Sequence, residues 1–452
     1  MQTSRSVAWL VAALASTMAL ASCANDERSP FDPSADRRPP ALVDFTVTTA
    51  GQHVYATWQA DEPVHAVVEY DAADGTVHHS YSGDRGFATS GVTKLLKLAS
   101  HATYGDVRVR LRDRAGNEAI AQPAGGDTFA TDVVADEELL FLAMIDVGWG
   151  DALYLQSPEG TRVLIDAGQP QHAPDVHRFL WDYLNVRSLD FVSMTHVHSD
   201  HIGGFYGDSF SGVNGLLSPL AQPQRIAVRT FIDLADKTPG TVSGSPYGSL
   251  AGAISGMLAA QPPQLERYVA LHTGASSDNE PALRWGAELK VDLLAEGRKD
   301  FLIPDYALQS AIASVQNNDS MIYRVQFRDF VLLLMGDGEF ATEEFLENRY
   351  SPEFLRADVL KLGHHGSNDA NSERWLNFVD PTAALITNVV SENPGVEHPF
   401  VLGRLKHRGT DYYASDRVIP NRDRAESGVR GDVLLYSDGH AFTMVVDHIR
   451  YE

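Results

Sequence analysis

The segment HVHSDHIGG, at residues 196–204, constrains the fold of this chain more than any other, because it places four potential metal ligands within six residues. An apolar run at residues 189–194 precedes it and predicts a buried strand. Histidines two positions apart after a strand can bind one metal ion where the loop turns, and the Asp-His pair beyond them can supply a second point. The two glycines would let the chain bend tightly into the next element. Imidazoles and carboxylates are ligands of zinc and similar metals, so the segment predicts a metal site.

Further motifs lie in the order that is typical of the metallo-β-lactamase superfamily. They are MIDVGWGDA at residues 144–152, VLIDAG at 163–168, NNDS at 317–320 followed by VLLLMGD at 331–337, and DVLKLGHHGS at 358–367. Together with HVHSDH they resemble the ComEC-like group of that superfamily, the extracellular nuclease-like domain of competence proteins. The resemblance covers residues 138–452 and is looser between 205 and 316. It implies an α/β fold, the αβ/βα sandwich, in which two mixed sheets are covered by helices and the metal ions lie at one edge.

The same resemblance implies a dinuclear site with a bridging carboxylate. Asp337 follows the apolar run at residues 330–335, and the resemblance assigns it the bridging position. Asp166 is expected to orient the histidine loop through hydrogen bonds without binding metal. The two divalent ions are expected to be zinc, with manganese as the alternative. The implied metal ligands are His196, His198, Asp200, His201, Asp337 and His364.

The roles of two adjacent histidines, His364 and His365, are not separated by the motif. One should complete the second metal position and the other should face the substrate, and we take His364 as the ligand. The expected catalytic residues are therefore Asp200, His365 and His398. Asp200 would orient the nucleophile, and His398, in an EHP segment, would donate to a substrate oxygen or leaving group. The alternative for His398 is an ordinary surface histidine.

The first metal position is left one protein ligand short. Many superfamily members carry a further histidine between HxHxDH and the bridging aspartate. In this chain His272 is the only histidine between His201 and Asp337, and its surroundings match no motif. We therefore do not expect His272 to bind metal. Asp146 and Asp151 bracket the glycines of the MIDVGWGDA motif and are expected to shape that loop.

Hydrolysis of a phosphodiester by a hydroxide held between two metal ions is the predicted activity. The substrate would be a phosphodiester-type small molecule or an envelope polymer. A net charge of −24 over 452 residues argues against a broad basic surface for nucleic acid. Bound metal ions would add local positive charge, so nucleic acid stays open as a substrate. Two alternatives are a lactone or β-lactam hydrolase, and a non-catalytic module that binds in the cell envelope.

The N-terminus predicts a lipoprotein signal peptide at residues 1–22, which takes no part in the fold. An apolar run at residues 7–20 is too short for a comfortable membrane span and ends in LASC, which matches a bacterial lipobox. Cys23 is the only cysteine, so no intramolecular disulfide can form. Lipidation of Cys23 is preferred over an ordinary signal peptide with an incidental cysteine. The chain is therefore predicted to be exported and held in the membrane by lipid on Cys23, with Ala24 indicating the outer membrane or periplasmic side.

Three further segments complete the predicted organisation. Residues 23–40 are polar and contain prolines, which is typical of a tether. Residues 41–130 contain short alternating strands and turns, and resemble a fibronectin type III-like β-sandwich with Trp58 in its core. This sandwich is expected to act as a spacer. The hydrolase domain is predicted at residues 139–452, and the sequence leaves the oligomeric state open.

Overall fold

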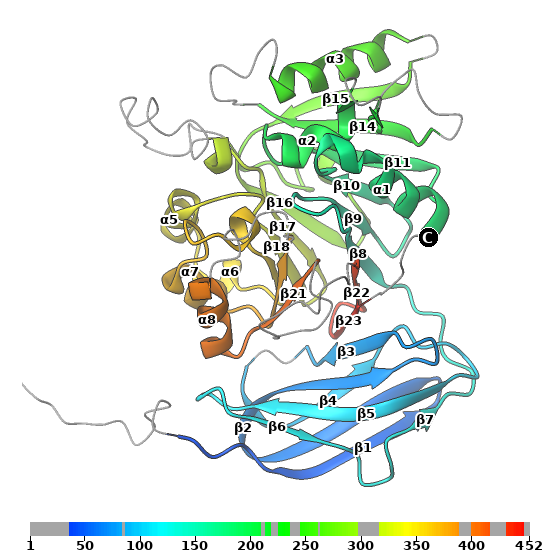
Figure 1. Ribbon diagram of the computed structural model, residues 1–452, viewed down its shortest axis with the longest axis vertical. Coiled ribbons are helices and arrows are strands. Elements are labelled where there is room, and N and C mark those ends of the chain that lie inside the picture. The colour runs from blue at the N-terminus through cyan, green and yellow to red at the C-terminus, as the bar shows by residue number, and fades with distance from the viewer. Residues whose placement is uncertain are drawn as a thin grey trace, which may run out of the picture.

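A computed structural model describes residues 36–83, 86–208, 213–217, 225–235, 245–260, 263–296, 316–387, 399–415 and 431–446. Figure 1 shows an α/β assembly of two facing sheets, with a β-sandwich packed below it. The predicted signal peptide, Cys23 and His398 lie outside the described residues. Within the part that the structure describes, no helix is long and apolar enough to cross a membrane.

The first α/β sheet is mixed, with its strands in the order β15-β14-β11-β10-β9-β8-β22-β23. Strands β10, β11, β14 and β15 are parallel, and the remaining pairs are antiparallel. The strands are β8 (Leu140–Met144), β9 (Leu153–Gln156), β10 (Arg162–Ile165), β11 (Ser188–Ser193), β14 (Ala227–Leu234), β15 (Leu265–Leu271), β22 (Val433–Ser437) and β23 (Phe442–Val446). Beside this sheet lie α1 (Ala173–Arg178), α2 (Ser199–Tyr206) and α3 (Pro246–Ala259), with short turns of helix at Pro170–His172 and Phe179–Tyr183 and a ribbon of β12 (Gly207–Asp208) and β13 (Val213–Asn214).

The second sheet runs in sequence order from β16 to β21. Its strands are β16 (Leu289–Ala295), β17 (Ile322–Phe327), β18 (Phe330–Leu334), β19 (Val359–Lys361), β20 (Ala383–Ile386) and β21 (Asp411–Ala414). Its outer face is covered by α5 (Phe340–Arg349), α6 (Pro352–Leu355), α7 (Glu373–Val379) and α8 (Pro399–Arg408), and short helical turns lie at Pro281–Leu283 and Gly363–Gly366. The architecture is the αβ/βα sandwich that the sequence predicted.

Strand β18 shows why its sequence is an uninterrupted apolar run. Leu332 belongs to the core between the two sheets, whereas Leu333 belongs to the core between the second sheet and its helices. Successive side chains of a strand point to opposite faces, so a strand that is covered on both faces needs apolar residues at every position. Because the strand is buried throughout, the polar residues that follow it have a fixed starting point at the sheet edge.

The N-terminal module, residues 41–130, is an all-β unit with its own apolar core. Its strands are β1 (Leu42–Ala50), β2 (His53–Asp71), β3 (Val77–Tyr81), β4 (Ala88–Leu95), β5 (Thr103–Arg112), β6 (Glu118–Ala121) and β7 (Phe129–Ala130). Trp58 is buried in this core together with Phe45 and Tyr70. The alternation of buried and exposed positions along β2 agrees with a strand that has one face inside.

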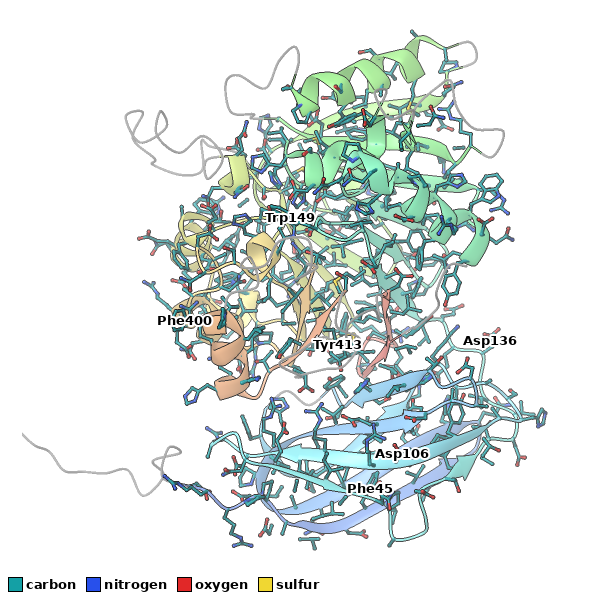
Figure 2. All side chains as sticks on the ribbon, viewed as in Figure 1. Phe45, Asp106, Asp136, Trp149, Phe400 and Tyr413 are labelled. Atoms are coloured by element: carbon teal, nitrogen blue, oxygen red, sulfur yellow. The ribbon has the colours of Figure 1, made fainter. Side chains whose placement is uncertain are left out.

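The N-terminal module continues the first α/β sheet instead of lying apart from it. Strand β3 pairs antiparallel with β23, so the sheet extends from the C-terminal domain into the module. Tyr81 of β3 stacks on Phe442 of β23, with ring centroids 4.6 Å apart. The expectation of a simple spacer is therefore incomplete, because the module contributes hydrogen-bonded strands and buried side chains to the body of the protein (Figure 2).

Helix α2 corrects the expected role of the two glycines in HVHSDHIGG. Gly203 and Gly204 lie inside the helix, where they do not bend the chain. A Cβ atom on Gly203 would lie 2.2 Å from Cδ of Pro170, and one on Gly204 would lie 2.0 Å from the carbonyl oxygen of Ala167. Glycine is needed here because the helix packs directly against the backbone that follows β10.

Candidate metal centre

The histidine loop leaves the end of β11 and enters α2 at Ser199. Asp166, just after β10, holds the start of this loop. Its carboxylate accepts hydrogen bonds from the Thr195 backbone N–H at 2.7 Å and from the Thr195 hydroxyl at 2.6 Å. The same carboxylate lies 2.8 Å from Nδ1 of His201. Asp166 therefore lies where the sequence expected an orienting residue, behind the loop and in contact with one histidine.

One group of candidate ligands contains His196, His198 and Asp337. Nε2 of His196 lies 3.0 Å from Nδ1 of His198 and 3.7 Å from Oδ2 of Asp337. The opposite nitrogen of His198 lies 3.0 Å from Oε1 of Gln316. This contact directs Nδ1 of His198 towards His196, so the two imidazoles present one nitrogen each to the same point.

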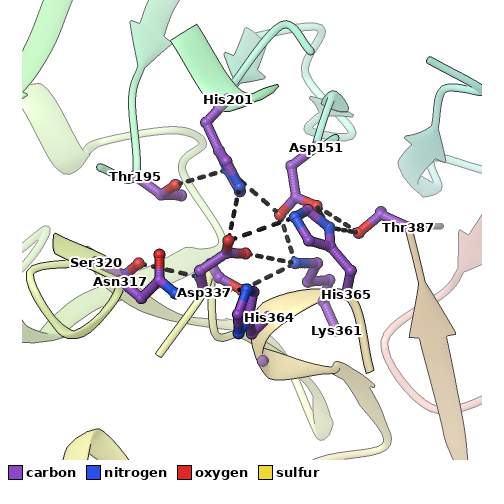
Figure 3. A network of polar contacts seen from close by, with 12 residues as sticks. Asp151, Thr195, His201, Asn317, Ser320, Asp337, Lys361, His364, His365 and Thr387 are labelled. Carbon is purple, nitrogen blue, oxygen red and sulfur yellow. Dashed lines mark hydrogen bonds and ion pairs between the residues drawn. The ribbon is translucent and has the colours of Figure 1, made fainter. Parts of the chain in front are cut away.

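A second group contains Asp151, His201 and His365 around the same Asp337 carboxylate (Figure 3). Oδ2 of Asp337 lies 3.1 Å from Nε2 of His201 and 3.4 Å from Nε2 of His365. Oδ2 of Asp200 lies 3.3 Å from Nε2 of His365. Asp337 thus lies between the two groups, which is the place of a bridging carboxylate.

The donor atoms of these groups fit divalent metal ions. Oδ1 of Asp337 is buried without a hydrogen-bond partner among the described residues, and Nε2 of His201 and Nε2 of His365 both point towards the Asp337 carboxylate. A buried polar atom without a partner costs about 1–3 kcal/mol, and a bound cation would offset that cost. Imidazole nitrogens and carboxylate oxygens are the donors that zinc and related ions prefer.

The electrostatics of the first group also suit a metal. Burial, followed by the neighbouring His201 and His198 imidazoles, holds the pKa of His196 well below its ordinary value. His196 is therefore neutral, which is the form that binds a metal ion. Burial alone would raise the pKa of Asp337, but His201 and His365 hold it well below its usual range. The shared carboxyl is therefore ionised.

The two adjacent histidines lie in different places. His364 and His365 both have left-handed backbone conformations, with φ of 45° and 52°. This turn sends the His365 side chain into the centre, where it is fully buried. Nδ1 of His364 instead lies 2.9 Å from Oδ1 of Asp369. His365 is thus the histidine of the pair that lies against Asp337, whereas His364 belongs to a separate group with Glu339 and Asp369. The assignment of ligand and catalytic roles to the two residues stays a prediction.

Asp151 is a site residue whose position the sequence did not reveal. It is buried beside His365, with Oδ1 3.2 Å from Nδ1 of that ring, and Oδ2 lies 2.5 Å from Nζ of Lys361. Distance alone groups Asp151 with the metal ligands. We instead place it behind His365, because it faces Nδ1 while Nε2 faces Asp337. The signal was present in the DVGWGDA and DVLK motifs, but nothing in the sequence joins Asp151 to Lys361.

His272 lies away from the centre, whereas Trp149 lies beside it. The side chain of His272 is 67% exposed and lies 3.9 Å from Oε2 of Glu296, and it belongs to none of the candidate ligand groups among the described residues. Trp149 stands edge-on to His365, with ring centroids 6.2 Å apart. Trp149 therefore places an aromatic ring beside the centre.

The architecture is a metallo-β-lactamase-type αβ/βα sandwich with a candidate metal centre at one edge. No family model matches the chain. Among solved structures it is similar to a diphosphatase of the PhnP family, with 15% identity, a TM-score of 0.29, and coverage of 54% of this chain and 85% of that one. It is also similar to the metallo-β-lactamase MIM-1 from Novosphingobium pentaromativorans, with 12% identity, a TM-score of 0.28, and coverage of 53% and 85%.

In sequence, the chain is similar to competence proteins. It is 23% identical over 274 residues to ComE operon protein 3 of Bacillus subtilis (strain 168), which is 57% of this chain and 29% of the relative. It is 33% identical over 102 residues to the competence protein ComA of Neisseria gonorrhoeae, which is 22% of this chain and 14% of the relative. The chain thus spans less than a third of the length of these relatives. The resemblance to the ComEC-like group is confirmed.

Proposed function

We propose that this protein is a phosphodiesterase that uses two divalent metal ions, most simply zinc. The observation that carries hydrolytic chemistry is the shared carboxylate of Asp337, which lies within 3.7 Å of His196 and 3.1 Å of His201. A pair of ions bound at this point would lower the pKa of a water molecule and neutralise charge on the attacked group. A non-catalytic module would have no need of these donor atoms at this point.

The choice of a phosphodiester rests on the motifs shared with the competence proteins and on the open first position. Two histidines and Asp337 supply three donors there among the described residues, which leaves room for oxygens of the substrate. Asp200 lies at the start of α2, where its carboxylate can orient a nucleophile. His398, outside the described residues, remains our candidate for protonating the leaving group.

A cavity of about 210 Å³ opens directly beside the metal centre. The lining near the metal ligands includes His198, Asp200 and Gln316. Ser245 and Tyr247, from the loosely matched region 205–316, also line the cavity. This volume suits a small substituent on the phosphorus better than a duplex. With a net charge of −24, the rest of the protein would repel a long polyanion. We therefore favour a short phosphodiester, free or attached to an envelope polymer.

The proposal is tested with purified protein that has been loaded with zinc or manganese. The substrates are bis(p-nitrophenyl) phosphate, p-nitrophenyl phosphate, DNA, a lactone and a chromogenic cephalosporin. Metal-dependent turnover of the phosphodiester, lost in Asp337→Ala and retained in His272→Ala, is the expected result. Turnover of the cephalosporin or lactone with none of either phosphodiester substrate would overturn it. Turnover of DNA alone would replace the short phosphodiester with nucleic acid.

We also propose that the protein is exported and anchored by lipid on Cys23. The support is the apolar run that ends in LASC at residues 20–23. Similarity to competence proteins is compatible with a place in the cell envelope. An envelope location would bring the enzyme to polymers that carry phosphodiesters.

A further inference from the structure

We infer that Asp151 is a positioning residue that selects Nε2 of His365 as the metal-binding nitrogen. This inference rests on the metal centre of the proposed function but not on its substrate. A neutral imidazole carries its proton on one nitrogen and offers the other to a metal. Whichever acceptor faces Nδ1 of His365 therefore decides which nitrogen is left for the ion.

The contacts of Asp151 supply that acceptor in a fixed orientation. Oδ1 lies 3.2 Å from Nδ1 of His365 and accepts a hydrogen bond from the Thr387 hydroxyl, whose oxygen lies 3.1 Å from the same Nδ1. Asp151 and the hydroxyl that it orients therefore face this nitrogen together. Oδ2 lies 2.5 Å from the ammonium of Lys361. Each carboxylate oxygen thus has its own partner, so the group cannot rotate without breaking an ion pair inside the protein. Asp151 and Lys361 are both buried, which makes such a loss costly.

The backbone of Asp151 is held as firmly as its side chain. Its N–H donates to the carbonyl oxygen of Asp200 at 3.1 Å, and its carbonyl accepts from the Gly168 N–H at 2.8 Å. The preceding Gly150 has φ of 140°, and a Cβ atom there would lie 2.3 Å from the Asp200 carbonyl oxygen. The loop after β8 is therefore pressed against the helix that carries the other ligands.

Lys361 and Thr387 belong to the second sheet, and both contact Asp151. Lys361 is the last residue of β19, and Thr387 directly follows β20. Besides Asp151, Lys361 donates to the Gly336 carbonyl oxygen at 2.9 Å and lies 4.0 Å from Oδ1 of Asp337. The buried Lys361 ammonium thus contacts both Asp151 and the end of β18, where Asp337 follows (Figure 3).

The arrangement repeats on the other side of the centre. His201 has Asp166 at Nδ1 and Asp337 at Nε2, at 2.8 and 3.1 Å. His365 has Asp151 at Nδ1 and Asp337 at Nε2, at 3.2 and 3.4 Å. The two histidines of one metal position are therefore each held by a separate buried aspartate. Such partners orient the ring and raise its basicity, and their loss typically costs 10- to 100-fold in metal affinity.

The test measures metal binding without any substrate. Asp151→Asn keeps the size of the side chain but can present an amide N–H to His365, which would favour the wrong tautomer. Zinc affinity is measured by competition with a chelator, and the coordination is followed by the absorption spectrum of the cobalt-substituted protein. His365→Ala is the reference for outright loss of the ligand, and Asp329→Asn, with a side chain 82% exposed, is the matched control.

Asp151→Asn is expected to weaken one metal equivalent by about 10- to 100-fold and to shift the cobalt spectrum towards that of His365→Ala. Asp329→Asn should match the wild type. If Asp151→Asn fails to fold by circular dichroism, Thr387→Val takes its place and should show a smaller loss in the same direction. Wild-type affinity and an unchanged cobalt spectrum in the folded variant would overturn the inference. Absence of phosphodiesterase activity would contradict the proposed substrate and leave these metal measurements decisive.

Discussion

Arg110 of the N-terminal module and Asp411 of the C-terminal domain form a bidentate ion pair across 301 residues of sequence. The two hydrogen bonds measure 2.9 and 3.1 Å, and both residues are buried. The same guanidinium donates through Nε to Glu69 at 2.9 Å. An Arg-carboxylate pair of this geometry is directional as well as attractive, so it sets how the module sits on the sheet that β3 and β23 share.

Replacing Arg110 should therefore destabilise the whole protein rather than the module alone. Arg110→Leu removes the bidentate partner of the buried Asp411 carboxylate, while Glu69 keeps its contact with Arg108 at 2.8 Å. Breaking a buried pair in this way costs about 3–5 kcal/mol. Urea unfolding should show this loss in the free energy of unfolding. Arg38→Ala is the control, because Arg38 is 73% exposed in its pair with Asp61 and should cost less than about 1 kcal/mol. Equal effects of the two substitutions would contradict the structural role of Arg110.

The buried His78 of β3 should make the folded protein less stable in mild acid. Burial, and then the neighbouring His79, lowers its pKa to about 4. Because the folded pKa lies below the unfolded value of about 6.5, stability is complete above pH 6.5 and is lost as the pH falls towards 4. His78→Phe should reduce the loss of stability between pH 6.5 and 4 by as much as about 3 kcal/mol in the free energy of unfolding. The melting temperature of this variant should therefore change less with pH than that of the wild type. The exposed His272→Gln should leave the profile unchanged, and an identical acid profile for His78→Phe would disprove the assignment.

Two glycines in helices should respond to alanine with opposite signs. In an open helix position, Gly→Ala stabilises by about 1 kcal/mol, and a Cβ atom on Gly252 of α3 would meet no atom within 4 Å. On Gly203 of α2 the same atom would lie 2.2 Å from Cδ of Pro170, so Gly203→Ala must push the helix away. Because α2 carries Asp200 and His201, this variant should also bind less zinc. Thermal unfolding and zinc content measure both effects, and stabilisation by Gly203→Ala would refute the packing argument.

Lipid anchoring can be tested independently of the metal centre. Cys23→Ser removes the only thiol of the chain and should release the exported protein from the membrane fraction. Metabolic labelling with a fatty acid should mark the wild type and not the variant. Soluble wild-type protein after export would contradict the predicted anchor.

Much of the metal centre could be predicted from local sequence. His196, His198 and Asp200 lie within one short segment after an apolar strand, so their proximity needs no knowledge of the rest of the fold. Asp337 could be placed at a sheet edge because the run before it is apolar at every position, as a strand covered on both faces requires. The sandwich architecture was implied by the resemblance that the motifs carry, and the structure agrees with it.

The choice between His364 and His365 could not be made from sequence. Adjacent residues differ in direction by their backbone angles, and here both adopt left-handed conformations that no residue type in the motif demands. Only the packing of this turn against neighbouring strands determines which ring is buried. The same holds for the glycines of α2, whose need became visible only when Pro170 and Ala167 were found against them.

The sequence by itself determined the residues that can bind metal and the strands that carry them, because both are written in short-range patterns of polarity and spacing. The tertiary structure decided which aspartate stands behind each histidine and how the N-terminal module joins the sheet. Asp151 lies in the loop between β8 and β9, Lys361 ends β19 and Thr387 follows β20. Arg110 meets Asp411 across 301 residues of sequence. Such contacts depend on how the two sheets pack together. Short-range sequence patterns do not specify which distant residues this packing brings into contact.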